Sequence, residues 1–475
     1  MGCAWKVGLG LVWLGLGGCA AVPAVRVPAV PVAVASVAGE DVPAQWWALF
    51  KSEELDRMIR AAFAQNPTLE AAQAALREAQ ENYNARAGRV RYPEVTAVLS
   101  SARQKSSPAA AGLSNDSGGG VFDLHHASVN VGYAFDFFGG GRRALEDLKA
   151  RVDYQNFQLE AVRLSLAANI VTTVIREAAL REQLAALKAI LISEEKQLGL
   201  LDAQMALGGV ARAEVLSWRA QVEQTRAAVP PVEKELFQVR HQRMVLAGKF
   251  PAEEAAGPRF DLASISEPAV LPIALSSSLV RQRPDIRAAE ALVQAASARA
   301  GVAAANLYPQ ITLNGSYGSQ SGQAAAFFNA NSVVWSFGAG LVQPVIDGGR
   351  LRAERRAALA ALDAASAQFR QVVFLAYADV ADVLRALGTD ARTLQACTDA
   401  LAAAGAALDM TQQQMAVGAV SYSLLLNAER QYQQARIGLI EARAARLADA
   451  AALFQALGGG WWHRAAEGSG VALKE

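Results

Sequence analysis

The chain repeats itself at a spacing of 210 residues, and this duplication limits its possible folds more than any other feature. Segment 204–210 reads QMALGGV and segment 414–420 reads QMAVGAV. Two other features recur in the same order: an X-Pro step before a helical run that ends at Tyr-Pro, and a glycine-rich turn followed by arginine. Each half is therefore predicted to contain a helix, two strands, a very long helix and a further helix, and the two halves form one architecture.

Two long proline-free segments predict unusually long helices. Segment 142–207 contains a single glycine, Gly199, and would form a rod of roughly 100 Å at 1.5 Å per residue. Segment 350–417 also lacks proline, and within it apolar residues recur every seven positions at Leu387, Leu394, Leu401, Leu408 and Met415. This period predicts coiled-coil packing.

Four short segments predict strands with one apolar and one small, polar face. In segment 128–137 the apolar residues alternate strictly, at Val129, Val131, Tyr133, Phe135 and Phe137. Segments 311–320 and 335–341 are similar, and segment 95–103 is weaker. Such strands are typical of a transmembrane barrel with an aqueous lumen, and a half-buried sheet of a water-soluble protein is the alternative. Four strands cannot close a membrane barrel, which needs about eight, so several chains would share one; three chains supply twelve strands.

The N-terminus predicts export and lipid attachment. Lys6 precedes an apolar run at 7–16 that is too short to span a bilayer. The run ends in LGGC, which resembles the processing box of bacterial lipoproteins, so Cys19 is the predicted lipidated residue; an ordinary signal peptide with a coincidental cysteine is the alternative. The predicted organisation is a signal peptide at 1–18, a lipidated tether at 19–41, a first repeat at 42–260, a second repeat at 261–461 and a tail at 462–475.

Charge and residue spacing exclude several functions. The chain has 45 basic and 44 acidic residues and no basic tract, which argues against a nucleic-acid partner. None of its four histidines has zinc-ligand spacing, and Gly248-Lys249 lacks the Ser or Thr of a phosphate-binding loop. We therefore expect neither an enzyme nor a cofactor or metal site, with His125 and His126 in an exposed loop.

Five strings carry a resemblance to a known family: WWALF at 46–50, Asn66-Pro67, RQRPDIRAAE at 281–290, QPVIDGGR at 343–350 and ALGGGW at 456–461. In this order they resemble the TolC-type outer membrane factors, most closely the lipoprotein (NodT-like) branch of tripartite RND multidrug efflux systems. The resemblance covers about residues 42–461.

The resemblance implies a mainly α-helical homotrimer with a membrane β part, in which four strands per chain form a twelve-stranded β-barrel continued by a long α-helical coiled-coil barrel. The trimer would be lipid-anchored in the outer membrane of a Gram-negative bacterium and extend into the periplasm. Small organic compounds or drugs would pass through it passively. A periplasmic adaptor, an inner-membrane RND pump and outer-membrane lipid are the implied partners.

The resemblance also assigns roles at the periplasmic end. It implies a constriction at the start of the last long helix, formed by Ser423, Asn427 and Arg430. The family has an acidic residue where Asn427 stands, so a threefold ring here loses three charges and should be less cation-selective, unless Glu429 or Glu214 replaces them. Adaptor contact is expected at the helical turns, at Gly208, Val210, Gly418 and Val420.

Two other uses of the same architecture stay open. The duct could serve type I protein secretion or metal efflux, although six methionines do not form the methionine-rich path expected for soft metals. A lipid-anchored periplasmic coiled-coil scaffold is the alternative of a different class, and it predicts no pore.

Overall fold

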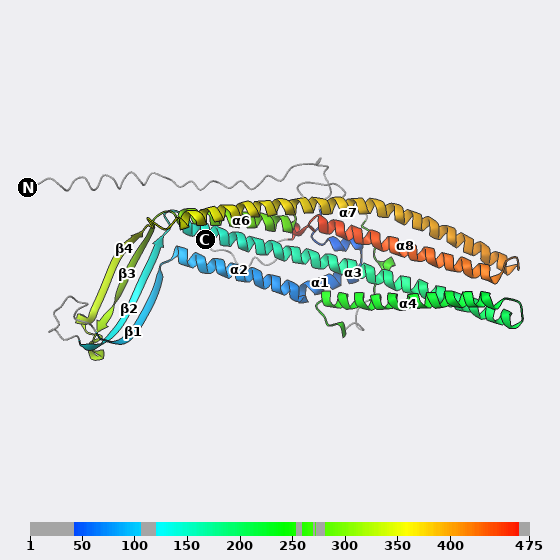
Figure 1. The fold of residues 1–475 in the computed structure, drawn as a ribbon, viewed down its shortest axis with the longest axis horizontal. Coiled ribbons are helices and arrows are strands. Elements are labelled where there is room, and N and C mark those ends of the chain that lie inside the picture. Colours follow the sequence, from blue (N-terminus) through cyan, green and yellow to red (C-terminus); the bar gives the residue numbers. More distant parts are fainter. Residues whose placement is uncertain (1–41, 106–119, 253–258, 269–270, 272–280, 465–475) are drawn as a thin grey trace, which may run out of the picture. The chain divides into compact units, whose positions relative to one another are not determined.

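The computed structural model describes residues 42–105, 120–252, 259–268, 271 and 281–464 (Figure 1). The predicted signal peptide, the tether and Cys19 lie outside the described residues. The main elements along the chain are α1 (Glu53–Gln65), α2 (Pro67–Arg91), β1 (Glu94–Lys105), β2 (Val121–Phe135), α3 (Gly140–Ala206), α4 (Arg212–Leu246), α6 (Pro284–Ala305), β3 (Gln310–Ser321), β4 (Val333–Val342), α7 (Arg350–Ala416) and α8 (Tyr422–Ala456). Short 3₁₀ turns include η1 (Trp46–Phe50) and η7 (Trp461–His463).

The predicted duplication is confirmed by the lengths of the helices. Helices α3 and α7 each contain 67 residues, and α4 and α8 each contain 35. Helices α7 and α8 begin 210 positions after α3 and α4, at Arg350 against Gly140 and at Tyr422 against Arg212. The two halves therefore follow the same plan, element for element.

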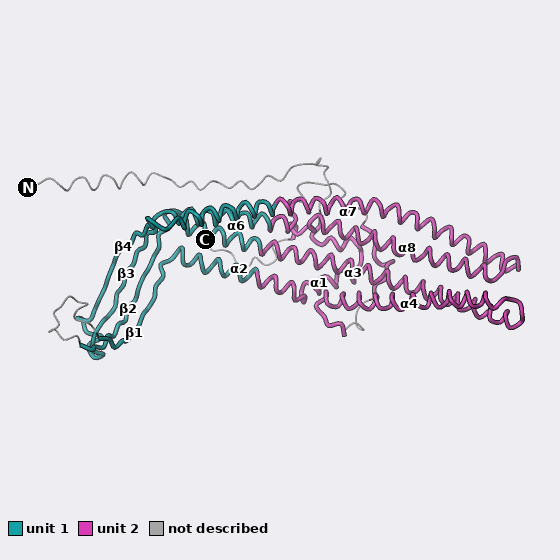
Figure 2. Tube along the Cα trace, viewed as in Figure 1, with its two compact units in different colours: residues 1–29, 76–154, 289–369 teal, residues 30–75, 155–288, 370–475 magenta. Residues whose placement is uncertain are grey.

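The chain packs into two compact units that cut across the repeats (Figure 2). Unit 1 comprises the described residues of 76–154 and 289–369, and unit 2 comprises those of 42–75, 155–288 and 370–464. Each repeat thus contributes to both units, so neither repeat folds as a domain of its own. The repeat boundary at residues 260 and 261 remains a prediction.

The sheet of unit 1 is antiparallel with the order β1-β2-β3-β4, and its register aligns the apolar residues on one face. Val129 lies opposite both Ala97 and Tyr317, and Tyr317 in turn lies opposite Trp335. Because side chains alternate between the faces of a strand, this register places all the odd-numbered apolar rows on the same side. The predicted two-faced sheet is confirmed.

The other face of the sheet is polar. The expectation that His125 and His126 lie in an exposed loop was wrong. Ser316 and Ser336 pair through their hydroxyl groups at 2.8 Å, and Asn130 Nδ2 donates to Ser128 Oγ at 3.2 Å. His125 and His126 belong to β2 instead of a loop, because β2 begins at Val121 and continues the pairing with β1. His126 Nε2 lies 2.9 Å from Ser128 Oγ.

The apolar face of the sheet is exposed in the single chain. Leu99 is 81% exposed, Trp335 73% and Phe337 72%. A continuous apolar surface of this kind needs an apolar partner or a lipid environment. Among the helices of the described residues, none is both long enough and apolar enough to cross a membrane.

An aspartate caps the start of each of the two longest helices, α3 and α7. Asp136 accepts hydrogen bonds from the backbone N–H groups of Gly141 and Arg142 at the start of α3. Asp347 accepts from Gly349 and Leu351 at the start of α7, and these backbone bonds lower the pKa of Asp347. The carboxylates satisfy helix donors that have no intrahelical acceptor. Glycine stands in the two turns because Gly139, Gly348 and Gly349 have positive φ values.

In the C-terminal half of α7, the buried and half-buried positions follow the predicted coiled-coil period. Less exposed positions after Leu387 alternate in steps of three and four residues, at Asp390, Leu394, Cys397, Leu401, Ala404, Leu408, Thr411 and Met415. Gly405 packs against the ring of Tyr432 on α8, and Gly438 of α8 lies near Cys397 Sγ. Cys397 is therefore a seam residue of the α7–α8 contact.

Candidate functional site

Two matching turns end the long helical hairpins of unit 2 on the same side (Figure 1). Gly208 has φ +76° in the α3–α4 turn, and Gly418 has φ +72° in the α7–α8 turn. In each turn the next N–H closes the helix by donating to a carbonyl five residues earlier, Gly209 to Gln204 at 2.8 Å and Ala419 to Gln414 at 2.9 Å. Positive φ at the helix end explains why glycine stands at both positions.

The turns also present apolar side chains that the sequence analysis did not select. Leu207 is 89% exposed and Val417 is 80% exposed, whereas Val210 and Val420 are half-buried. The 210-residue match could have shown this pair, because Leu207 and Val417 follow the repeated QMA string at the same position.

The three predicted constriction residues lie on one face of α8. Ser423, Asn427 and Arg430 are separated by four and three residues, a spacing that aligns side chains along a helix, and all three are half-buried. Ser421 caps the helix, its Oγ accepting from the N–H of Leu424 at 3.3 Å. Ser423 Oγ lies 2.8 Å from Ser421 Oγ.

The two residues considered as replacements for the missing charge differ in environment. Glu429 accepts a hydrogen bond from Ser193 Oγ of α3 at 2.7 Å, which directs its carboxylate to the neighbouring helix. Glu214 is exposed in the first turn of α4.

A cavity of about 450 Å³ lies between α3, α4 and α8. Its wall is formed by Leu187, Ile190, Glu194, Gln221, Gln224, Thr225, Ala228, Arg430, Gln431 and Gln434. Arg430 therefore lines this cavity, and Glu194 faces it from α3. Sequence reasoning missed Glu194, because a glutamate in a helix is ordinarily solvated.

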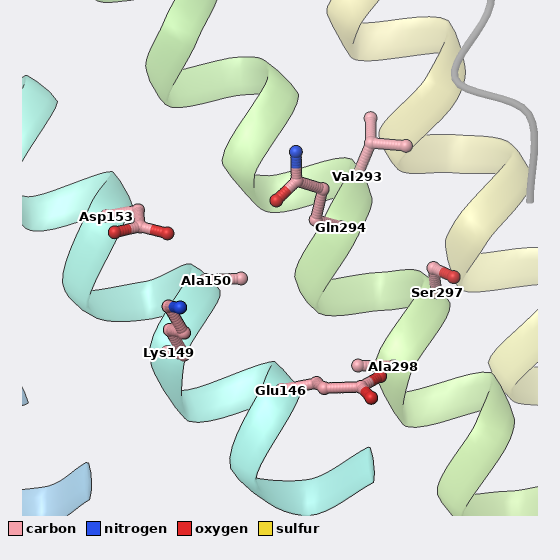
Figure 3. A pocket seen from close by; sticks show the side chains of 8 residues that line it. All are labelled: Glu146, Lys149, Ala150, Asp153, Val293, Gln294, Ser297 and Ala298. Carbon is pink, nitrogen blue, oxygen red and sulfur yellow. The ribbon is translucent and has the colours of Figure 1, made fainter. Parts of the chain in front are cut away.

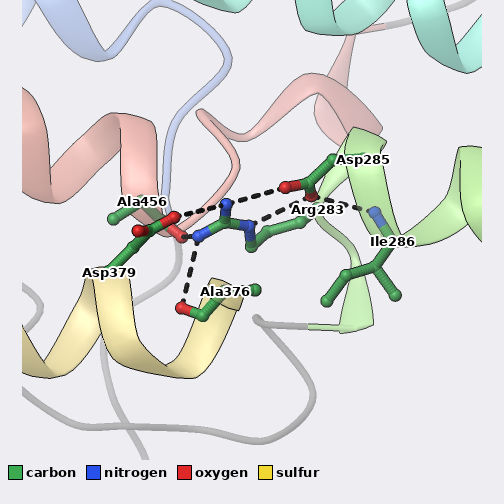
Figure 4. Close-up of polar contacts among 6 residues, drawn as sticks. All are labelled: Arg283, Asp285, Ile286, Ala376, Asp379 and Ala456. Atoms are coloured by element: carbon green, nitrogen blue, oxygen red, sulfur yellow. Dashed lines mark hydrogen bonds and ion pairs between the residues drawn. The ribbon is translucent and has the colours of Figure 1, made fainter. Parts of the chain in front are cut away.

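The buried Arg283 joins the start of α6, the middle of α7 and the end of α8 in unit 2 (Figure 4). Arg283 donates to Asp285 through Nε and Nη2 at 3.1 and 2.7 Å and to Asp379 through Nη2 at 3.1 Å. Its Nη1 donates to the carbonyl of Ala456 at 3.0 Å, at the end of α8. Burial lowers the pKa of Arg283, but the hydrogen bonds and charges of the two aspartates outweigh it and leave the pKa above its ordinary value.

Several of the strings that carried the family resemblance meet around this arginine. Trp461 Nε1 donates to the carbonyl of Gln282 at 2.8 Å, and Trp46 stacks on Phe454 with ring centroids 5.4 Å apart. These strings are thus packing motifs of unit 2.

A groove of about 400 Å³ lies between α3 and α6 in unit 1 (Figure 3). Glu146 extends from α3 toward Ala298 of α6, with Lys149 and Asp153 on the α3 side. Nearby, Arg299 of α6 donates to Asp147 of α3 at 3.1 Å and ties the two helices together. Within the described part of the chain no three His, Cys, Asp or Glu side chains are grouped to hold a metal ion.

An acidic pair between α7 and α8 makes stability depend on pH. Burial, followed by the charge of Asp390 and a hydrogen bond with it, raises the pKa of Asp449 to about 6. The native state thus holds this proton more tightly than the unfolded chain, so the contribution is present at low pH and is lost as the pH rises through about 6. Arg446, one turn away, does not compensate, because it binds Glu267 and the carbonyl of Leu387.

We expect the thermal stability of the wild type, relative to Asp449→Asn, to fall between about pH 4 and pH 7 by on the order of 1 kcal/mol, after allowance for solvent screening. Melting curves followed by circular dichroism at several pH values measure this difference. Asp409→Asn, an exposed change on α7, serves as control. Parallel pH profiles for wild type and Asp449→Asn would contradict the assignment.

Comparison with known proteins agrees with this architecture. A family model described as outer membrane efflux protein matches the chain twice, over residues 58–242 and 275–459. The pyoverdine export outer membrane protein OpmQ of Pseudomonas aeruginosa is 31% identical over 88% of this chain and 87% of its own length. The probable outer membrane lipoprotein SilC of Salmonella typhimurium is 27% identical over 88% of both chains. The open-state structure of the MtrE outer membrane channel of Neisseria gonorrhoeae superposes with a TM-score of 0.81 and 25% identity, covering 93% of this chain and 98% of that one. The chain belongs to the outer membrane efflux protein family and is an outer-membrane efflux channel, not an enzyme.

Proposed function

We propose that three copies of the chain close one twelve-stranded barrel in the outer membrane, continued by a helical duct that conducts small organic compounds out of the cell. The observation that carries this proposal is the register of the sheet, which gathers the apolar side chains on one face and small polar ones on the other. Strands β1 and β4 are the edges of the sheet. Open edges are prohibitive in lipid, so each edge pairs with a neighbouring copy.

The proposed partners follow from the family and from the turns of unit 2. Outer-membrane efflux channels receive their cargo from an inner-membrane pump through a periplasmic adaptor. We assign adaptor contact to the turns at Gly208, Val210, Gly418 and Val420, supported by the exposed Leu207 and Val417 beside them. An RND pump and a small organic cargo are proposed by analogy, and OpmQ, named for pyoverdine export, is a precedent for the latter.

The proposed anchor is a lipid on Cys19 in the outer membrane. Its support is the LGGC string at 16–19 and the relative SilC, which is named a probable outer membrane lipoprotein.

The proposed constriction is formed by Ser423, Asn427 and Arg430, and Asn427→Asp tests it. In purified full-length protein inserted into planar bilayers, wild type is expected to give discrete conductance steps with weak cation preference. Asn427→Asp adds three like charges to the ring, and should raise the cation-to-anion permeability ratio severalfold at neutral pH. The added selectivity should fade as the pH drops toward the ordinary aspartate pKa of about 4.

The matched control is Asn84→Asp, which adds the same charge on the exposed surface of α2. Discrete steps with unchanged selectivity in Asn427→Asp would remove the constriction assignment but leave the duct intact. The absence of steps in every variant would overturn the duct itself.

A further inference from the structure

We propose that the edge of the sheet nearest the long helices binds the headgroups of acidic phospholipids, an inference that rests on the proposed membrane barrel. The register places the starts of β1 and β3 and the ends of β2 and β4 at this edge, and Figure 1 shows α2, α3, α6 and α7 meeting the sheet there. Exposed arginines in the helix ends next to this edge form what we call the arginine belt: Arg91, Arg142, Arg352, Arg355 and Arg356.

The lengths of the strands place the arginine belt at the depth of the lipid headgroups. The strands contain 10 to 15 residues, and about 9 to 11 tilted residues cross the hydrocarbon core of a bilayer. Side chains directly beyond the edge therefore lie in the headgroup layer. Arg91 stands three positions before the first residue of β1, and Arg352 stands two positions after the first residue of α7.

The direction of α7 brings its other two arginines toward the same layer. Arg355 and Arg356 lie about one turn further along the helix than Arg352. Side chains of a helix tilt toward its N-terminus, which in α7 is the end next to the sheet. Arginine can also extend its long stem and place the charged group at a membrane interface.

Aromatic side chains mark this depth on the apolar face of the sheet. Tyr133, Phe135 and Phe137 follow one another at the end of β2, with successive ring centroids 5.0 and 5.6 Å apart. Phe137, just beyond the strand, is 67% exposed. Membrane barrels carry aromatic girdles at their two interfaces, so these rings place the headgroup layer beside the arginine belt.

The charge of the arginine belt is not neutralised within the chain. Four carboxylates near the edge already cap helices or pair with Arg143 and Arg350: Asp136, Asp347, Glu146 and Glu354. Among the described residues, no arginine of the belt forms an ion pair, and the exposed Glu94 at the start of β1 offsets only part of their charge.

Unpaired guanidinium groups at this depth fit phosphate oxygens. A guanidinium binds phosphate through two parallel N–H groups. The net positive charge of the belt favours headgroups with a net negative charge over zwitterionic ones. Three copies of the chain would repeat the belt around the barrel.

Electron paramagnetic resonance of spin-labelled lipids tests the arginine belt, because it measures which lipids are immobilised at the protein surface. Full-length protein is reconstituted in dioleoylphosphatidylcholine vesicles that contain a trace of spin-labelled phosphatidylglycerol or phosphatidylcholine. We expect the protein to prefer phosphatidylglycerol severalfold. The preference should weaken as NaCl is raised from about 0.05 to about 0.5 M, because salt screens exposed charges.

The triple variant R352Q/R355Q/R356Q should lose roughly half of this preference or more. The matched control, R370Q/R385Q/R392Q, removes the same charge from exposed positions of the same helix. Its first changed residue lies about 30 Å from the start of α7 at 1.5 Å per residue, so the control should keep the preference of the wild type. Circular dichroism confirms that both variants are folded.

Equal binding of the two lipids by the wild type, or an unchanged preference in R352Q/R355Q/R356Q, would overturn the arginine belt. A shift in the cation-to-anion permeability ratio of the triple variant with its lipid preference intact would also overturn it, because the arginines would then face the lumen. Conductance steps from the same preparations separate these results from failure of the duct. Steps without a lipid preference would reject the belt alone, whereas the absence of steps in every preparation would reject the duct on which it rests.

Discussion

Replacing Gly318 by alanine is expected to break the pairing between β2 and β3. An added Cβ at Gly318 would meet the backbone carbonyl oxygen of Ala127 and would lie 2.8 Å from the Cα of Ser128. Both obstacles are backbone atoms of the paired strand, so no side-chain rotation relieves the clash. Glycine is therefore required here by the close approach of two backbones.

The expected cost is about 3 kcal/mol or more, at the upper end for an overpacked site. The effect is large because β2–β3 is the pairing that joins the first repeat to the second. We expect Gly318→Ala to lose the assembled protein on gels run without heating, and to lose conductance steps in bilayers.

Gly338→Ala is the matched control for this change. Gly338 lies on the same polar face, opposite Asn314, and an added Cβ there has no atom within 4 Å. Equal yields of assembled, conducting protein from the two variants would contradict the close approach.

Patterns with a short period predicted most of the fold correctly, because they depend on local geometry. The alternation from Val129 to Phe135 identified the apolar face of β2, and the seven-residue spacing from Leu387 identified the seam of α7. Such periods follow directly from two residues per pleat and 3.6 residues per helical turn. The start of β2 was missed, because residues 121–127 pair with β1 without showing a clear alternation.

Features that depend on distant segments could not be predicted in the same way. Glu194 has the same local sequence context as the exposed Glu195, and only packing by α4 and α8 distinguishes them. The helical spacing of Ser423, Asn427 and Arg430 was visible in the sequence, but not that Arg430 Nε is buried. The RPD string at 283–285 indicated a family, and its role emerged only with its partner at Ala456.

Replacing Arg283 by methionine is expected to cause a large loss of stability. The methionine keeps much of the volume but removes the guanidinium that donates to the carbonyls of Ala456 and Ala376 and pairs with Asp285 and Asp379. Removing one member of a buried ion pair costs about 3–5 kcal/mol. We expect the low end, about 3 kcal/mol, because the side chains of Asp285 and Asp379 are 44% and 57% exposed and remain partly hydrated.

Three variants separate the contributions of charge and geometry at this position. Arg283→Lys keeps the charge but not the planar fork that binds Asp285 through two nitrogens, so it should recover only part of the loss. Arg281→Met removes an exposed arginine two residues away and should be nearly neutral. Denaturant unfolding followed by circular dichroism measures all three. If Arg283→Met were as stable as Arg281→Met, Arg283 would not be holding α6, α7 and the end of α8 together, and the packing of the neighbouring tryptophans, Trp46 and Trp461, would have to carry that contact alone.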